Sequence, residues 1–237
     1  MIKEWTVLDR GGILCKILEV YKTCGIDSFP VNSIEVIQTL GIPLFKYSEL
    51  PSRKELECHR VSDDAFKLKG SIYYNDTFPH LCRQRFTLMH EVGHILLDHA
   101  GDTMENDLEA DFFASNILAP RILIHRLKCY DAALIHGTFG LSYAASNRAL
   151  LSYREWFRKI SYSAARRPSD TELQLEHMVF PNPSCLSTNS MKPSATRSRL
   201  SRDTEECIDF FDELQRNRGN TYWMERAKSQ WLYANDL

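Results

Sequence analysis

Two histidines and a glutamate near the middle of the chain have the spacing of a metal site. The run His90-Glu91-Val92-Gly93-His94 places the histidines four residues apart. In a helix, residues i and i+4 project from one face, so both imidazoles could bind a single Zn²⁺. Glu91 would then lie beside the open coordination position, where it could take a proton from water and pass it to a leaving amine. The pattern predicts metal-assisted hydrolysis.

A site of this kind needs a third protein ligand, and the sequence excludes one of its usual positions. One large class of zinc hydrolases extends the pattern to H-E-x-x-H-x-x-G-x-x-H. Leu97 and Ala100 occupy the positions where that pattern has Gly and His, which excludes the class. His99 falls one residue short, and we expect it to end the helix, where its charge suits the helix dipole. In another class of zinc hydrolases, the gluzincins, the third ligand is a carboxylate from a following helix.

The following segment offers two carboxylates at helical spacing. Asp107 and Asp111 form an i, i+4 pair, so both can face the first helix. One can bind the metal while the other orients a ligand histidine through its second ring nitrogen. Glu109 points about 160° away from Asp107 at about 100° per residue, and it is the alternative ligand. Ala110 and Ala114 form a stripe of small residues that permits close helix packing.

Hydrophobic periodicity and turn residues predict the elements that position these side chains. Residues 84–99 show the clearest helical spacing, and residues 106–118 form the next helix, with Pro120 opening another. The other expected helices cover residues 12–23, from 32 or 33 to 40, 131–138 and 142–159. Short strands are expected at 42–47, 65–68 and 71–74, with turns at Lys69-Gly70 and Phe139-Gly140.

The pattern changes beyond residue 160. We expect residues 161–204 to be a linker or mobile loop, because residues 181–204 are dominated by Ser, Thr, Pro and Asn. Residues 205–237 should form a C-terminal helical segment. Within it Trp223, Ala227 and Trp231 share one face that must dock on something.

Composition limits the remaining function classes. The 237 residues are 43% hydrophobic and 25% charged, with a formal net charge of −2, which is ordinary for a globular protein and unsuited to coating nucleic acid. The 7 cysteines are scattered and include no C-x-x-C pair, so neither a disulfide framework nor a zinc ribbon is expected. No apolar run approaches the ~20 residues that span a bilayer, and the N-terminus does not read as a signal peptide. We expect a cytoplasmic protein with no membrane partner.

Several aromatic and histidine side chains are candidates for binding substrate or steadying an oxyanion. The strand Ser71–Tyr74 precedes the metal helix, and a strand edge beside such a site can receive an extended peptide. Tyr73 and Tyr74 could also hydrogen-bond the oxyanion, although core packing of at least one is the simpler account. Tyr143, His125 and His136 are further candidates.

Residues 132–159 have the spacing of a helix-turn-helix. Ala145 and Arg148 belong to this spacing. With Arg154, Arg158 and Lys159 the unit could contact DNA, but a three-helix packing unit gives the same apolar spacing. Since the net charge does not favour nucleic acid, direct nucleic-acid binding is not expected. Closing the cleft and contacting a protein substrate is the preferred role.

Two motifs together resemble a known family. The first is Arg85-Phe86-Thr87-Leu88-Met89-His90-Glu91-Val92-Gly93-His94, and the second is Glu109-Ala110-Asp111-Phe112-Phe113-Ala114, followed by Leu118-Ala119-Pro120. In this order and at this separation they resemble the ImmA/IrrE family of metallo-endopeptidases, whose pattern is R-F-T-x-x-H-E-x-G-H, then E-x-E-A-[ND]-x-F-A, then L-L-x-P. The resemblance is close over residues 83–120 and extends over roughly 1–160.

The resemblance implies a gluzincin-like α+β fold, in which a small twisted sheet packs against the metal helix and the ligand helix, with a helical C-terminal part. It implies His90 and His94 as ligands of Zn²⁺ and Glu91 as the general base. The family's third ligand is a Glu four residues before the [ND] position, where this chain has Asp107. Because Asp is one methylene shorter, either the two helices approach more closely or metal affinity falls. Asp111 would take the supporting role.

The function implied by the resemblance is a cytoplasmic zinc endopeptidase that inactivates a helix-turn-helix repressor of a phage or mobile element, an anti-repressor. One alternative is a protein of the same fold that binds a repressor without cutting it. Another is a DNA-binding regulator acting through residues 131–159. Two histidines and a carboxylate also suit Mn²⁺ or Fe²⁺, so the pattern alone leaves the metal open.

Overall fold

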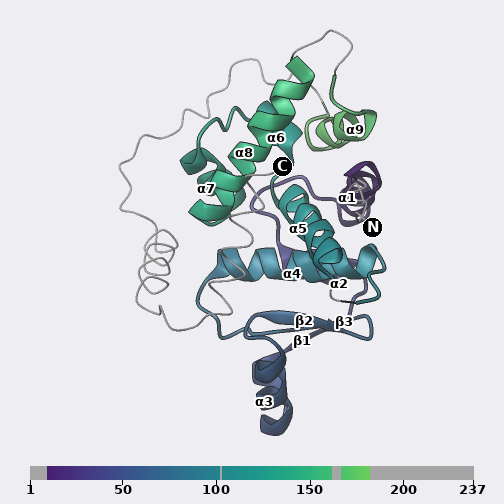
Figure 1. Ribbon diagram of the computed structural model, residues 1–237, viewed down its shortest axis with the longest axis vertical. Coiled ribbons are helices and arrows are strands. Elements are labelled where there is room, and N and C mark those ends of the chain that lie inside the picture. Colours follow the sequence, from purple (N-terminus) through teal and green to yellow (C-terminus); the bar gives the residue numbers. More distant parts are fainter. Residues whose placement is uncertain (1–9, 102, 162–166, 182–237) are drawn as a thin grey trace, which may run out of the picture. The chain divides into compact units, whose positions relative to one another are not determined.

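The computed structural model describes residues 10–101, 103–161 and 167–181, which form helices around one small sheet (Figure 1). Within these residues, no helix combines the length and the apolar character required to cross a bilayer. The helices are α1 (Arg10–Cys24), α2 (Ser33–Thr39), η1 (Tyr47–Glu49), α3 (Ser52–Val61), α4 (Leu81–Leu96), α5 (Met104–Leu118), α6 (Arg121–Arg126), α7 (Ala132–Phe139), α8 (Tyr143–Ser161) and α9 (Asp170–Val179). The strands are β1 (Leu44–Lys46), β2 (Ala65–Leu68) and β3 (Ser71–Tyr74).

The three strands form a sheet in the order β1-β3-β2. Strand β1 is parallel to β3, whereas β2 and β3 form a hairpin whose turn residues Lys69 and Gly70 have φ of 51° and 75°. This left-handed pair is the backbone that tight hairpins require. Strand β3 is central and already paired on both sides, so it offers no free edge to a peptide. The expectation of a receiving edge at Ser71–Tyr74 is therefore wrong, and the described edges are β1 and β2.

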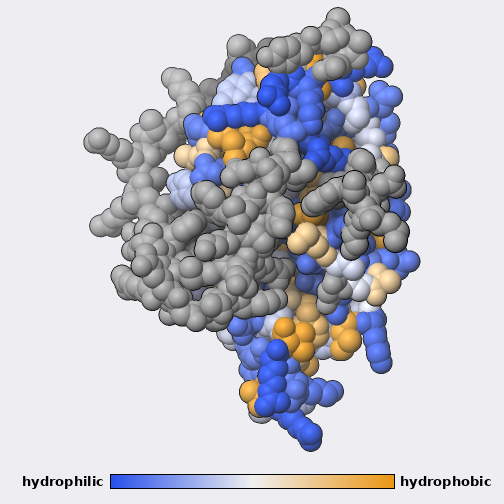
Figure 2. Space-filling view, viewed as in Figure 1, coloured by the Kyte–Doolittle hydropathy of each residue, from blue (hydrophilic) through white to orange (hydrophobic). Residues whose placement is uncertain are grey.

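The two faces of the sheet differ in what covers them. Ile72 and Tyr74 are buried on the face toward α4, and Lys67 of β2 shares that face because it pairs with Ile72. The opposite face carries a stack of three rings, in which Tyr73 lies 5.0 Å from Phe45 and 5.3 Å from Phe66 between ring centroids. Figure 2 shows hydrophobic surface over the sheet and α3. The exposed apolar residues of these elements are Phe45, Leu56, Val61 and Leu68.

The core lies between α4, α5 and the helices that surround them. Leu88, Met89 and Val92 of α4 are almost completely buried, and Phe113 and Ile117 of α5 pack into the same cluster. Both helices follow their expected ranges within a few residues. The N-terminus of α5 is capped by Thr103, whose hydroxyl accepts a hydrogen bond from the Asn106 N–H. These two antiparallel helices present the candidate ligands to each other.

The helical part from α6 to α8 also follows the sequence prediction. Asp131 caps α7 by accepting from the Leu134 N–H, and Ser142 accepts from the Ala145 N–H at the start of α8. Gly140 ends α7 in the left-handed conformation, with φ of 63°. The Arg85 guanidinium of α4 donates to the Gly140 carbonyl, and an added Cβ at Gly140 would lie 2.6 Å from it. Arg85 thereby fixes the α7–α8 turn against the metal helix.

The structure differs from the sequence prediction in two helices. Asp170–Val179 form α9 inside the range expected to be a linker, because Ser169 and Glu172 make a reciprocal capping box at its start. Ion pairs from Arg121 and Arg126 of α6 to Glu172 and Glu176 attach it to the described unit. The linker prediction is therefore wrong for these residues. Residues 182–204 and the predicted C-terminal helical segment 205–237 lie outside the described residues.

The second unpredicted helix is α3, at Ser52–Val61. Only Cys58 of its side chains is buried, so its sequence carries almost no apolar periodicity. It begins after Pro51, which fixes its own φ and lacks the N–H that a helix start leaves unpaired.

Candidate metal centre

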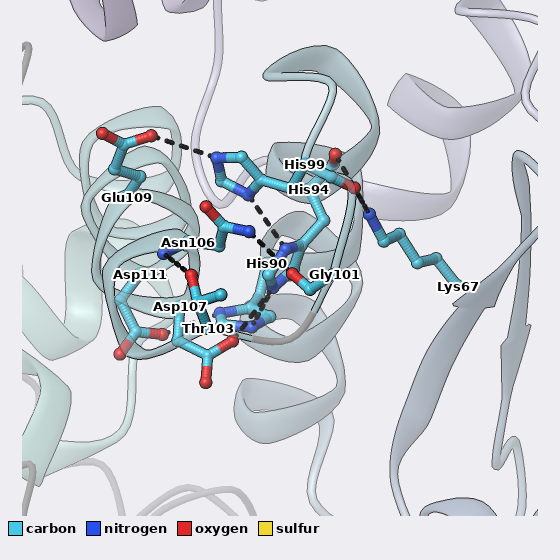
Figure 3. A network of polar contacts seen from close by, with 10 residues as sticks. All are labelled: Lys67, His90, His94, His99, Gly101, Thr103, Asn106, Asp107, Glu109 and Asp111. Atoms are coloured by element: carbon cyan, nitrogen blue, oxygen red, sulfur yellow. Dashed lines mark hydrogen bonds and ion pairs between the residues drawn. The ribbon is translucent and has the colours of Figure 1, made fainter.

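The two histidines of the H-E-x-x-H run point the same ring nitrogen toward one another. The Nε2 atoms of His90 and His94 are 3.0 Å apart, and the side chains are only 7% and 4% exposed. One helical turn separates the residues on α4, which is why both rings leave the same face. Figure 3 shows them facing α5.

Helix α5 brings its carboxylates to that face, as the spacing of Asp107 and Asp111 predicts. Because α4 and α5 are antiparallel, His94 lies opposite Asp107 and His90 lies opposite Asp111. Asp107 Oδ1 lies 3.4 Å from His94 Nε2, and Asp111 Oδ1 lies 2.7 Å from His90 Nδ1. A carboxylate only accepts, so His90 donates from Nδ1 and keeps a lone pair on Nε2. Asp111 therefore holds the His90 ring through Nδ1, the nitrogen that is not available to a metal.

His90, His94 and Asp107 fit a metal ion. One ligand atom from each lies within 4.8 Å of the others. Ligand atoms around a tetrahedral zinc with bonds of about 2.0–2.1 Å are about 3.3 Å apart, so small side-chain rotations complete the site. Two nitrogens and a carboxylate oxygen are also the donor set of catalytic zinc sites, which keep a fourth position open. The Asp107 side chain is 46% exposed, so solvent reaches the centre from the side on which Asp107 lies.

The two helices that carry the histidines and Asp107 pack closely against each other. An added Cβ on Gly93 would lie 3.2 Å from both Ala110 Cα and Phe113 Cδ1. Gly93 sits between the two histidines on α4, and Ala110 sits between the two acids on α5. The two helices therefore approach closely between the candidate ligands, and this approach depends on these two small residues.

Gly93→Ala is expected to weaken zinc binding by about tenfold, because moving α5 outward by a few tenths of an ångström carries Asp107 from the histidines. Ala110 Cα is backbone and cannot rotate away. The measurement is a zinc titration against a chromophoric chelator. Gly137→Ala is the matched control, since that helical glycine has open space around it and the change should be neutral or stabilising by up to about 1 kcal/mol. Unchanged affinity in Gly93→Ala would show that close packing does not set the position of Asp107.

Glu91 lies in the interior next to these ligands, with 9% of its surface exposed. Its charge also acts on Tyr47 of η1, a buried residue whose hydroxyl donates to the Ser62 carbonyl at 3.0 Å. Burial raises the pKa of Tyr47, and the negative charges around it, including Glu91, raise it further. Tyr47 therefore stays neutral beside the carboxylate. Glu91 is thus a buried acid on the metal helix, adjacent in sequence to the ligand candidate His90.

The sequence analysis did not foresee the role of His99. Its Nδ1 lies 3.0 Å from His94 Nδ1, and its Nε2 lies 3.0 Å from Glu109 Oε2 (Figure 3). Burial lowers the pKa of His99, and its hydrogen bond to Glu109 opposes that shift. Glu109, the alternative ligand, is thus engaged with His99 and is outside the three-residue group. The available signal was a histidine five residues after His94, just past the helix end.

The predicted oxyanion and substrate residues each make contacts of their own in the structure. Tyr73 is stacked on the sheet face that points away from α4, and Tyr74 is buried beneath α4 with 3% exposed. Tyr143 stacks on His136 at 4.4 Å between ring centroids, at the α7–α8 corner. His125 is bonded to the Tyr153 hydroxyl between α6 and α8. These contacts give each of them a packing role.

Arg148 of α8, part of the predicted helix-turn-helix spacing, faces the protein. Burial lowers the pKa of its guanidinium, and the Asp111 carboxylate opposes that shift. Its charge thus acts on the acid that supports His90. The Arg148 guanidinium thus lies on the His90–Asp111 side of the centre, whereas His99 lies on the His94 side.

A comparison with protein families now bears on this geometry. Residues 41–151 match the model of the peptidase M78 family, described as the IrrE N-terminal-like domain. These residues form an IrrE N-terminal-like domain. The resemblance drawn from the two motifs is confirmed, and the matched range contains all of α4, α5 and α7. No curated protein and no solved structure matches the chain significantly.

The IrrE-like domain is metallopeptidase-like, and its α+β architecture, mostly helices around a three-stranded sheet, is consistent with a zincin-like fold. The match begins at residue 41 and leaves α1 and α2 outside it. Those helices nevertheless belong to the same core, since Tyr21 of α1 donates to the Ile117 carbonyl of α5 at 2.8 Å. The packing unit is larger than the matched domain.

Proposed function

We propose that this chain is a zinc-dependent endopeptidase that inactivates a helix-turn-helix repressor of a mobile element. The observation that carries the proposal is the convergence of His90 Nε2, His94 Nε2 and Asp107 Oδ1 on one point, beside buried Glu91. The donor set favours zinc, and the family match favours peptide hydrolysis. The choice of a repressor as substrate rests on the motif resemblance.

In this proposal, each residue has a separate task. Zinc held by the three ligands would polarise the scissile carbonyl and lower the pKa of an attacking water. Glu91 takes a proton from that water and gives it to the departing amine nitrogen, so its carboxylate is regenerated. Asp111 holds the His90 ring by accepting from Nδ1. The half-exposed Asp107 marks the side from which substrate approaches.

The sheet offers a place for an extended substrate segment. Strand β2 is an edge of the described sheet, and Lys67 from its middle donates to the carbonyls of His94 and His99 at the end of α4. A peptide that paired with β2 would therefore run beside the metal helix, with main-chain hydrogen bonds supplying affinity. A segment must be unfolded to bind in this way, which favours a flexible region of the repressor.

The test is incubation with a candidate helix-turn-helix repressor, followed by mass spectrometry of the products. Zinc-loaded protein should give one or a few discrete fragments. Removing the metal with a chelator should lower the cleavage rate at least about a hundredfold, and added Zn²⁺ should restore it, because the polarising ion is lost and regained. Parallel arms with Mn²⁺ and Fe²⁺ identify the preferred metal. An intact repressor that nevertheless loses DNA binding would favour the non-cleaving alternative.

A further inference from the structure

His94 is supported by a chain of two side chains, unlike His90. Its Nδ1 is 3.0 Å from His99 Nδ1, and His99 Nε2 is 3.0 Å from Glu109 Oε2. The His99 side chain is 5% exposed, whereas Glu109 is 31% exposed, so the chain runs from the buried centre toward the surface of α5. Figure 3 shows the three side chains in this sequence.

The chemistry of these groups fixes where the ring protons lie. Glu109 only accepts, so His99 carries its proton on Nε2 and presents a lone pair on Nδ1. His94 Nδ1 faces that lone pair and must therefore donate. The remaining nitrogen of His94, Nε2, then carries the lone pair and lies 3.0 Å from His90 Nε2 and 3.4 Å from Asp107 Oδ1.

We infer that His99 is a positioning residue for the metal centre, which transmits the charge of Glu109 to His94 and sets the tautomer that exposes His94 Nε2 to the metal. This inference rests on the proposed zinc site and adds to it a residue outside the ligand set. It also gives Glu109 a task other than coordination.

The backbone at the end of α4 holds His99 in place. Asp98 has a left-handed φ of 54°, the His99 N–H donates to the His94 carbonyl at 3.1 Å, and the Asp98 N–H donates to the Ile95 carbonyl at 3.2 Å. This is the Schellman arrangement, which turns the chain back on the helix. Lys67 then donates to the carbonyls of both His94 and His99. The ring of His99 is thus brought against His94 by a fixed turn.

The first experiment compares zinc affinities in chelator competition. His99→Phe keeps a ring of similar size without hydrogen bonds, and its affinity should fall by about 10–100-fold, the cost typical of losing an outer partner of a ligand. His99→Gln offers one acceptor and one donor, and its affinity should stay within about threefold of wild type. Glu105→Gln, an exposed acid in the first turn of α5, is the control for lost charge. Equal affinities in wild type and His99→Phe, or equal losses in both His99 variants, would overturn the inference.

A double-variant cycle separates the two supports. Glu109 acts on His94 only through His99, so the double variant Glu109→Gln, His99→Phe should lose no more zinc affinity than His99→Phe alone. Asp111→Asn acts on His90, so its loss should multiply with that of His99→Phe. If the losses of zinc affinity from Glu109→Gln and His99→Phe multiplied in the double variant, the two residues would act separately, which would contradict the inferred connection from Glu109 through His99 to His94.

Nuclear magnetic resonance of ¹⁵N-labelled histidine in the wild-type protein gives a test that no variant can spoil by misfolding. We expect the proton of His99 on Nε2 and that of His94 on Nδ1 in the zinc-loaded protein. A proton on His99 Nδ1 would overturn the inference. If wild type bound no zinc, the proposed function would fail instead, and the tautomers of the metal-free protein would still report on the chain.

Discussion

Glu91→Gln is expected to lower repressor cleavage at least about a thousandfold while zinc stays bound, because an amide of the same size cannot accept the proton that a general base takes. The side chain is only 9% exposed, so an isosteric change preserves its packing. Cleavage rates and zinc content are measured on the same preparations. Glu105→Gln, an exposed acid on α5, is the control and should cleave like wild type.

Two other outcomes of Glu91→Gln have distinct meanings. Loss of zinc would make Glu91 a structural residue and leave its catalytic role unsupported. Full inactivation of an uncut repressor by the variant would show that the chain acts by binding, since binding does not require a proton acceptor.

Asp107→Ala is expected to weaken zinc binding at least about a hundredfold, a larger loss than the roughly 10–100-fold that follows from removing an outer partner. The reason is that Asp107 Oδ1 lies 3.4 Å from His94 Nε2 and completes the three-ligand group. Elemental analysis after dialysis should find about one zinc per wild-type chain and none in Asp107→Ala, as a site with three protein ligands requires.

Glu109→Ala is the matched comparison for Asp107→Ala. Both changes remove one carboxylate from the same helix, but Glu109 contacts His99 and is separated from the ligand atoms by that ring. Zinc binding by Glu109→Ala should be weakened but not abolished. The reverse order, with zinc kept in Asp107→Ala and lost in Glu109→Ala, would assign the third ligand to Glu109.

Features fixed by local spacing were predictable from the sequence. The i, i+4 pairs His90–His94 and Asp107–Asp111 face each other, since a helix puts such residues on one side whatever surrounds it. Turns such as Lys69-Gly70 and caps such as Asp131 are likewise decided by a few adjacent residues. For the same reason the metal-ligand candidates were found before any tertiary information.

Features that depend on longer-range order were not predictable. The central place of β3 follows from pairing with β1 across the whole of α3, which strand propensity does not encode. His99 lies outside the regular helix, and its contact with His94 depends on the left-handed Asp98, a conformation for which glycine is the usual signal. Helix α9 was obscured because its capping box lies within a range assigned on the composition of residues 181–204.

The candidate ligands and the side chains hydrogen-bonded to them, from His90 to Asp111, belong to a single helical hairpin. The contacts that build the centre are therefore local in the chain, and closing the short connection between α4 and α5 costs little loop entropy. The centre can consequently assemble as soon as this hairpin forms, before distant segments have docked. A bound ion would add its binding free energy to the cost of opening this hairpin, so α4 and α5 should unfold more slowly with the metal bound than without it.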